Sequence, residues 1–290
     1  MTEHPGARIT RISVRTALSR SGLPDLDYSL NPYVGCSHGC LYCYARDYTR
    51  RPEVAENWGF LVCVKENLLS ILERETRKLR PGTVGISTIT DPYQPVESVE
   101  KLTRRSIELL LKRGFRVSIQ TKSPLVLRDI DILRSFRDMV DVGFTIITLD
   151  SSVASLLEPG APSPAQRVRA LTKVSEEGLK TWLFYGPVVP GFNDDVASFA
   201  RVLEAVYGHV SLVLMDKLRV TPRVRSSLGS VVGDFEKIES LASNKTWWSS
   251  VVKAFTEICA RLAVKCVASL AEPPSERIRG LEVFSRKRGS

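Results

Sequence analysis

The periodicity of apolar and polar residues changes repeatedly along this chain of 290 residues. Short runs rich in β-branched residues, which are typical of buried strands, alternate with longer stretches whose apolar residues recur every three or four positions, as on one face of a helix. The alternation is most regular between residues 84 and 215. Strands that alternate with helices in this way indicate a parallel sheet covered by helices.

Six strands and five intervening helices are predicted from this pattern. The strands cover residues 25–31, 84–90, 116–122, 140–148, 181–189 and 210–215, and the helices cover residues 66–79, 99–112, 124–137, 165–177 and 194–207. Six strand–helix units are too few for a closed eight-stranded barrel. We therefore expect an α/β fold, an open and partial (β/α)6 barrel of the TIM type.

The last third of the chain is less regular. Its pattern predicts helices over residues 234–242 and 246–263 and a final strand over residues 264–269. Nothing in the chain resembles an internal repeat, a low-complexity segment or a second domain. We expect one domain over the whole chain, with a core of about residues 24–216 and a helical C-terminal extension of about residues 217–290.

Three closely spaced cysteines are the strongest chemical signal. Cys36, Cys40 and Cys43 form a C-x3-C-x2-C array within NPYVGCSHGCLYCYAR, and Tyr42 directly precedes the last cysteine. Thiolates this close in sequence can bind a metal centre from a single loop. Three protein ligands on a cubane iron–sulfur cluster leave the fourth iron open to a small molecule. The array therefore predicts an iron–sulfur site with an exchangeable position.

A non-catalytic module with a structural zinc is the main alternative, because His38 could join the three cysteines as a fourth ligand. Zinc sites usually divide their ligands into two separated pairs, so this spacing favours the cluster. A disulfide framework fits poorly with a chain of this size that has no secretory segment. The other cysteines fall in apolar patterns, and we expect them in the core: Cys63, Cys259 and Cys266.

Polar residues after the predicted strands form a second group of candidates. In parallel β/α folds, reactive residues gather at the carboxyl ends of the strands. This rule selects Lys122, Thr145, Thr90 and the loop DPYQPVE after it, which contains Asp91, Tyr93 and Gln94. Two prolines stiffen this loop, which suits a preorganised site that contacts a substrate. A rigid turn without a ligand is the alternative interpretation.

The cysteine loop resembles that of the radical S-adenosylmethionine (radical SAM) superfamily. Five further fragments resemble the spore photoproduct lyase branch of that superfamily, in the same order: TDPYQPVE, QTKSPLVLRDIDIL, GFTIITLD, LEPGAPSPAQRVRAL and GPVVPGFND. The similarity extends from about residue 23 to residue 194 and is thin beyond that. The chain is most similar to lyase-like relatives that carry the TDPYQP loop. The resemblance implies a radical SAM enzyme with a partial barrel.

The resemblance also implies roles for individual residues. Cys36, Cys40 and Cys43 would bind a 4Fe–4S cluster, with S-adenosylmethionine (AdoMet) as the second cofactor and Tyr42 near its adenine. The lyase's contacts to AdoMet correspond to Thr90, Lys122 and Thr145. Two of its charged positions correspond to Glu158 and Arg167. A surface role within its helix is an equally open interpretation of Arg167. The implied reaction is reductive cleavage of AdoMet to a 5′-deoxyadenosyl radical, which abstracts hydrogen from a substrate.

One position departs from the lyase. The lyase returns a hydrogen atom to its product from a cysteine thiol, and Thr88 stands at that position here. The O–H bond of a threonine is too strong for this transfer, so we do not expect the lyase reaction by that route. The sequence does not indicate the terminal hydrogen donor.

Charge and composition limit the partners. A net charge of +9 suits phosphate-rich partners such as nucleic acid, although the basic residues are scattered in the manner of a solvated surface. A nucleic acid is therefore the first candidate substrate, and a peptide or small molecule is the second. The reaction also implies a one-electron reductant of the ferredoxin or flavodoxin type. No apolar run is long enough to span a membrane and the basic N-terminus has no apolar signal core, so we expect a cytoplasmic protein.

Overall fold

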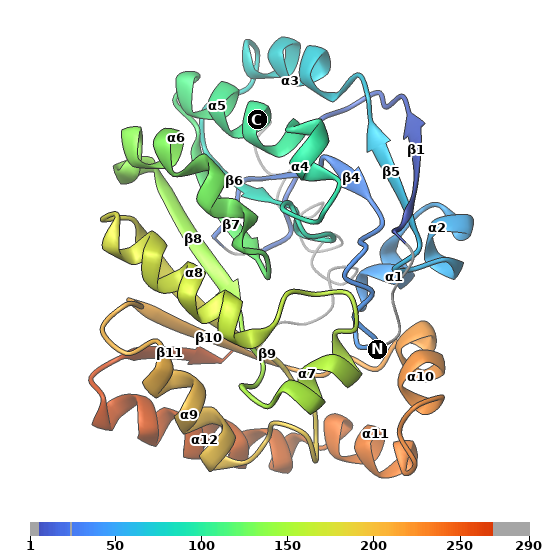
Figure 1. The fold of residues 1–290 in the computed structure, drawn as a ribbon, viewed down its shortest axis with the longest axis vertical. Helices are drawn as coiled ribbons and strands as arrows, with labels where there is room; N and C mark the ends of the chain where they lie inside the picture. Colours follow the sequence, from blue (N-terminus) through green and yellow to red (C-terminus); the bar gives the residue numbers. More distant parts are fainter. Residues whose placement is uncertain (1–5, 24, 269–290) are drawn as a thin grey trace, which may run out of the picture.

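A computed structural model of the chain describes residues 6–23 and 25–268. Its centre is a curved sheet of eight strands (Figure 1). In spatial order these are β2 (Leu18–Arg20), β3 (Tyr28–Leu30), β6 (Thr83–Ile86), β7 (Arg116–Thr121), β8 (Val140–Thr145), β9 (Lys180–Val188), β10 (Leu212–Lys217) and β11 (Lys265–Ala268). All neighbours from β3 to β11 are parallel, and β2 pairs antiparallel with β3.

Helices cover the outer side of this sheet (Figure 1). They are α3 (Leu68–Thr76), α4 (Glu97–Glu100), α5 (Leu102–Lys112), α6 (Ile130–Ser135), α8 (Pro164–Glu176), α9 (Val196–Ala205) and α12 (Lys245–Arg261). One large apolar core fills the space between the sheet and these helices. Three further helices, α7 (Ser151–Leu157), α10 (Pro222–Gly229) and α11 (Phe235–Ser243), contribute buried residues to a second apolar cluster that contains Cys40 and Tyr42. Within the described part of the chain, no helix has the length and hydropathy needed to cross a membrane.

The predicted partial (β/α)6 barrel is confirmed. The six predicted strands correspond to β3 and to β6 through β10, in sequential order across the sheet. The prediction was wrong about where β6 ends: the strand stops at Ile86 rather than Thr90, because Ser87 adopts a positive φ of 60° and turns the chain. The helix predicted over residues 124–137 is divided into α6 and two short 3₁₀ segments, Pro124–Asp129 and Arg137–Met139.

A second, small sheet was not predicted. It contains β1 (Arg8–Ile12), β5 (Leu61–Lys65) and β4 (Tyr33–Val34), with β5 in the middle. Two short helices, α1 (Ala45–Tyr48) and α2 (Pro52–Glu56), lie between β4 and β5 in the chain. Because β4 directly precedes the cysteines, this small sheet fixes the point at which the cysteine loop begins.

The three cysteines outside the motif lie in or against apolar cores, as expected. Cys63 and Cys259 are buried, and Cys266 packs against the main core. The structure also joins Cys259 of α12 to Cys266 of β11 in a disulfide, which was not predicted. Each cysteine had been placed by its own apolar pattern, and that pattern carries no information about which helix face meets which strand.

Gly143 in β8 provides a test of the packing. A Cβ atom at this position would lie 2.2 Å from Cε2 of Trp182, and the indole is held by a 2.7 Å hydrogen bond from its Nε1 to Asp141. Gly143→Ala should therefore lower the free energy of unfolding in urea by about 1–3 kcal/mol, as overpacked cores do. Adding Trp182→Leu should recover part of this loss.

Gly233→Ala is the control, because a Cβ atom there meets nothing within 4 Å. Equal losses of unfolding free energy for Gly143→Ala and Gly233→Ala would show that the Gly143–Trp182 contact is not the cause. Strictly additive effects of Gly143→Ala and Trp182→Leu in their double variant would show the same.

Candidate active site

The cysteine loop has almost no regular secondary structure and is held by other segments. Leu41 N–H donates to the Leu157 carbonyl at the end of α7 (2.9 Å), and Gly160 N–H donates to the His38 carbonyl (2.9 Å). The turn after α7 approaches so closely that a Cβ atom on Gly160 would lie 2.4 Å from the Ser37 carbonyl oxygen. Sequence reasoning missed Leu157 and Gly160, because their contribution is made by backbone atoms.

All three motif cysteines are free thiols. Cys36 and Cys40 are buried and Cys43 is half-buried. Burial raises the pKa of the Cys40 thiol to about 12, and burial followed by the neighbouring charges of Asp91, Cys40 and Cys43 raises the pKa of Cys36 well above its usual range. A raised pKa disfavours the thiolate, so these thiols would ionise only beside a positive centre such as a metal.

The donor atoms are not arranged around a single ion. Among residues 6–23 and 25–268, no three side chains of His, Cys, Asp or Glu lie close enough to hold one metal ion. Two thiolates on one tetrahedral zinc would be about 3.8 Å apart, given Zn–S bonds of about 2.3 Å. A cubane gives each thiolate its own iron, so its cysteines need not converge on one point.

Asp91 connects the loop after β6 to the end of β7. One carboxylate oxygen accepts from the Tyr93 backbone N–H (2.9 Å) and from the Thr121 hydroxyl (2.7 Å). The other accepts from the Lys122 backbone N–H (2.7 Å) and lies 3.5 Å from Nδ1 of His38. Asp91 thus holds Lys122 beside the cysteine loop.

Tyr93 and Gln94 also face the protein. Tyr93 is fully buried in the main core. Gln94 is fully buried as well, and its side chain binds the backbone of Gly35 and Ser37 in the cysteine loop. Contact with a substrate stays a prediction for Asp91, Tyr93 and Gln94.

Glu97 anchors the same loop and was not predicted to have a role. Its side chain is fully buried, accepts hydrogen bonds from the Tyr33 hydroxyl and the Thr103 backbone N–H, and pairs with Arg128 at 2.6 Å. The sequence gives no sign of this pair, because Glu97 and Arg128 are far apart in the chain and belong to no recognisable motif. The contact exists only because β4, α5 and the segment after β7 meet.

Glu158 is the centre of a buried charged group. Its carboxylate pairs with the Arg167 guanidinium at 2.6 Å, accepts a short hydrogen bond from the Tyr42 hydroxyl, and lies 3.9 Å from Nζ of Lys122. The Lys122 ammonium also lies 5.7 Å from the centre of the Tyr42 ring. Burial opposes the charge of Arg167, but Glu158 raises its pKa above the ordinary value, so the guanidinium stays charged.

Arg167 is therefore not a surface residue. It is 1% exposed, and its guanidinium donates to the carbonyls of Thr145 (3.2 Å) and Pro162 (2.8 Å). These contacts bring together four of the predicted cofactor residues, Tyr42, Lys122, Glu158 and Arg167, and place Thr145 beside them.

Some buried polar atoms of the predicted site residues and of the cysteine loop have no hydrogen-bond partner in the described part of the chain. They include the Thr90 hydroxyl and both ring nitrogens of His38. The Thr145 hydroxyl, in contrast, accepts from the Gln120 amide (3.1 Å). Buried polar groups are nearly always satisfied, so the Thr90 hydroxyl is available to a ligand, whereas Nδ1 of His38 already lies 3.5 Å from the Asp91 carboxylate. The free thiols of the cysteine loop and the buried charged group around Glu158 therefore lie side by side, joined by Tyr42.

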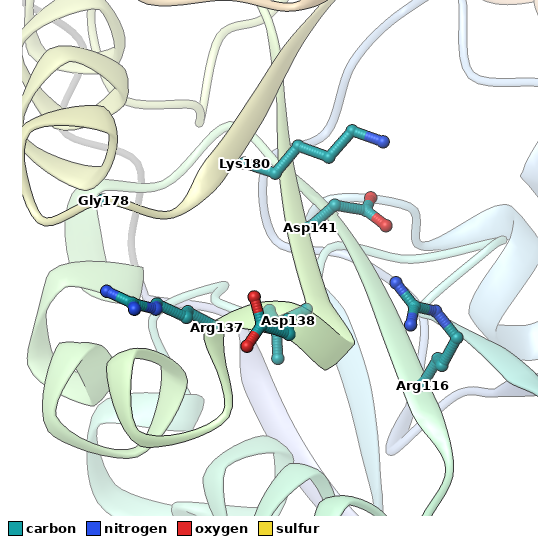
Figure 2. A pocket seen from close by; sticks show the side chains of 7 residues that line it. Arg116, Arg137, Asp138, Asp141, Gly178 and Lys180 are labelled. Atoms are coloured by element: carbon teal, nitrogen blue, oxygen red, sulfur yellow. The ribbon is translucent and has the colours of Figure 1, made fainter.

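The larger of the two cavities described here lies elsewhere. It has a volume of about 410 Å³ and opens at the amino ends of β7, β8 and β9, where Arg116, Asp141 and Lys180 gather (Figure 2). None of the predicted site residues lines it. A smaller cavity of about 160 Å³ borders the cysteine loop at Ser37 and Gly39. The candidate active site therefore lies at the carboxyl ends of the strands, away from the larger cavity.

Comparison with known proteins identifies the family. The sequence profile of the radical SAM superfamily matches residues 30–203. The chain belongs to the radical SAM superfamily. It is therefore a radical SAM enzyme, and the family implies AdoMet and a 4Fe–4S cluster as cofactors.

Two curated relatives illustrate the range of the superfamily. An uncharacterized protein of Methanocaldococcus jannaschii is 35% identical over 186 residues, which cover 64% of this chain and 70% of that protein. The radical SAM Nα-GlyT isomerase of Pseudomonas phage M6 is 28% identical over 185 residues, which cover 60% of this chain and 36% of that protein. Other relatives are matched over 56% or 51% of their length.

Solved structures show the same fold. Spore photoproduct lyase, as a double mutant with bound AdoMet and dinucleoside spore photoproduct, superimposes with a TM-score of 0.65 at 15% identity, covering 90% of this chain and 81% of the lyase. At this identity the likeness concerns the fold. The sequence profile confirms the predicted membership of the radical SAM superfamily, and the structural comparison confirms the similarity of the fold to spore photoproduct lyase.

Glu158 offers a test of the charged group in the metal-free protein. Glu158→Gln would leave Arg167 buried without its counter-charge, so the free energy of unfolding in urea should fall by about 3 kcal/mol or more. Adding Arg167→Met should recover part of that loss.

Glu108→Gln is the matched control, because Glu108 pairs with Lys112 at 2.6 Å on the surface. Loss of an exposed pair should cost roughly 1 kcal/mol or less. Similar losses for Glu158→Gln and Glu108→Gln would mean that Glu158 is not the centre of a stabilising buried group.

Proposed function

We propose that Cys36, Cys40 and Cys43 hold the 4Fe–4S cluster and that the residues around Glu158 bind AdoMet beside it. The observation that carries the proposal is the meeting of three free thiols, two buried and one half-buried, with the buried charged group around Glu158. When bound and reduced, the cluster supplies the electron that cleaves AdoMet to methionine and a 5′-deoxyadenosyl radical, which abstracts hydrogen from the substrate.

The protein's own residues bind and orient the cofactor. The unpartnered Thr90 hydroxyl is free to hydrogen-bond AdoMet, and the Lys122 ammonium can balance a carboxylate. The Tyr42 ring presents a flat surface to an adenine, while its hydroxyl is held by Glu158. Glu158 and Arg167 keep Tyr42 and the Thr145 backbone in place, and their burial keeps water from the reacting atoms.

A nucleic acid or nucleotide is the substrate class that we propose. The net charge of +9 supports it, and the similarity to a lyase solved with a dinucleoside photoproduct is a fold-level analogy in its favour. A peptide or small molecule is the second candidate, because basic residues such as Arg104 and Arg128 are already paired with acidic ones. The reaction also requires a one-electron reductant of the ferredoxin or flavodoxin type. Because Thr88 stands where the lyase has its thiol, we do not propose the lyase reaction itself.

AdoMet cleavage is the direct test. The protein is reconstituted anaerobically with iron and sulfide, reduced with dithionite and mixed with AdoMet. We expect 5′-deoxyadenosine and methionine to form, and chromatography measures both products. Cys40→Ala should form neither product, because one iron loses its thiolate. Cleavage that persists in Cys40→Ala would contradict the assignment of the cluster ligands.

His38→Ala separates the cluster from a zinc site. A zinc site that used His38 as its fourth ligand would lose its metal on this change, whereas a three-cysteine cluster would keep its iron. We expect iron content and the brown absorption to stay near the parent values. A colourless protein that holds one zinc, lost in His38→Ala, would overturn the proposed function.

Salt dependence tests the substrate class. If the protein contacts even two phosphates of a DNA or RNA oligonucleotide, its affinity should fall roughly tenfold between 50 and 200 mM salt, as counterion release predicts. Fluorescence anisotropy with a labelled single strand measures this. Absence of binding at 50 mM salt, or binding that does not change with salt, would favour a peptide or small-molecule substrate.

A further inference from the structure

Gln94 binds the backbone on both sides of the first motif cysteine. Its Oε1 accepts a hydrogen bond from the Ser37 backbone N–H (2.9 Å), and its Nε2 donates to the Gly35 carbonyl (3.1 Å). Gly35 and Ser37 are the residues directly before and after Cys36. The carboxamide therefore brackets Cys36, and it does so from a different strand–helix unit, the loop after β6.

The surroundings of the Gln94 side chain allow no other residue type to make the same two hydrogen bonds. Gln94 is fully buried, and Gly35 has a φ of +87°, with the Leu61 carbonyl oxygen 2.4 Å from where its Cβ would lie. The packing is therefore tight on the far side of the loop as well. A side chain here needs a donor and an acceptor next to each other, which a carboxamide has and an ionised carboxylate or a thioether lacks.

We propose that Gln94 is a positioning residue that fixes the backbone around Cys36 and thereby directs its thiol toward the iron–sulfur cluster. The inference rests on the proposed cluster site. It assigns Gln94 a role different from the substrate contact predicted from sequence. In its absence, the Ser37 N–H and the Gly35 carbonyl would be unpaired in a buried site, and the loop would relax to satisfy them.

Asn67 provides a matched control. Its carboxamide makes a comparable pair of backbone hydrogen bonds outside the cysteine loop, accepting from the Val14 N–H (2.9 Å) and donating to the carbonyl of the same residue (2.9 Å). Gln94→Met and Asn67→Leu each remove one such pair of bonds with little change in side-chain volume. A general loss of stability would affect the two variants alike, whereas a positioning role concerns Gln94 alone.

The first measurement uses metal-free, reduced protein. In Gln94→Met, hydrogen exchange of the Ser37 amide should accelerate at least tenfold, and alkylation of Cys36 should accelerate relative to Cys63. In Asn67→Leu, the Val14 amide should accelerate instead. Gln94→Glu serves as a second variant, because it keeps the acceptor for the Ser37 N–H and loses the donor for the Gly35 carbonyl. In this variant the Ser37 amide should exchange at close to the parent rate, while alkylation of Cys36 should still be faster.

The second measurement uses reconstituted protein. We expect iron to leave Gln94→Met at least tenfold faster than the parent under a chelator, with an altered electron paramagnetic resonance spectrum of the reduced cluster. Asn67→Leu should match the parent in both. Equal iron loss in the two variants, or unchanged Ser37 exchange in Gln94→Met, would overturn the inference. A parent protein that holds no iron would overturn the proposed function instead, while exchange and alkylation would still decide whether Gln94 brackets Cys36.

Discussion

The cysteine loop depends on hydrogen bonds from other parts of the chain, because it has no regular ladder of its own. Buried backbone groups must be paired, and here the partners come from three directions. Gln94 binds the loop on both sides of Cys36, the end of α7 binds Leu41, and Ser227 of α10 donates to the Leu41 carbonyl at 2.6 Å. The position of three thiols is thus a property of the assembled barrel.

The charged group around Glu158 also depends on partners from other segments, and an unpaired buried charge costs more free energy than an unpaired backbone group. A carboxylate without exposed surface is tolerated only with a counter-charge and hydrogen bonds, and Arg167, Tyr42 and Lys122 supply them. These residues come from α8, the cysteine loop and the end of β7. Their contacts tie these three segments together at the proposed cofactor site.

Much of the fold could be predicted because it depends on local periodicity. The six parallel strands and most helices follow from runs of β-branched residues and from helical spacing, and the C-x3-C-x2-C array is contiguous in the sequence. The break at Ser87, the small sheet of β1, β4 and β5, and the disulfide between Cys259 and Cys266 were missed. Each depends on backbone conformation or on contacts between distant segments, which local periodicity does not record.

The sequence by itself determined the fold class, the spacing of the cysteines and the types of residue at the strand ends, because these are set by neighbours along the chain. Only the tertiary structure decided what the residues do there. It buried Arg167 against Glu158, turned Gln94 toward the cysteine loop and left the Thr90 hydroxyl without a hydrogen-bond partner among residues 6–23 and 25–268. The physical reason is that burial and hydrogen-bond pairing depend on which segments meet in space, and many different sequences place the same residue types at the ends of strands.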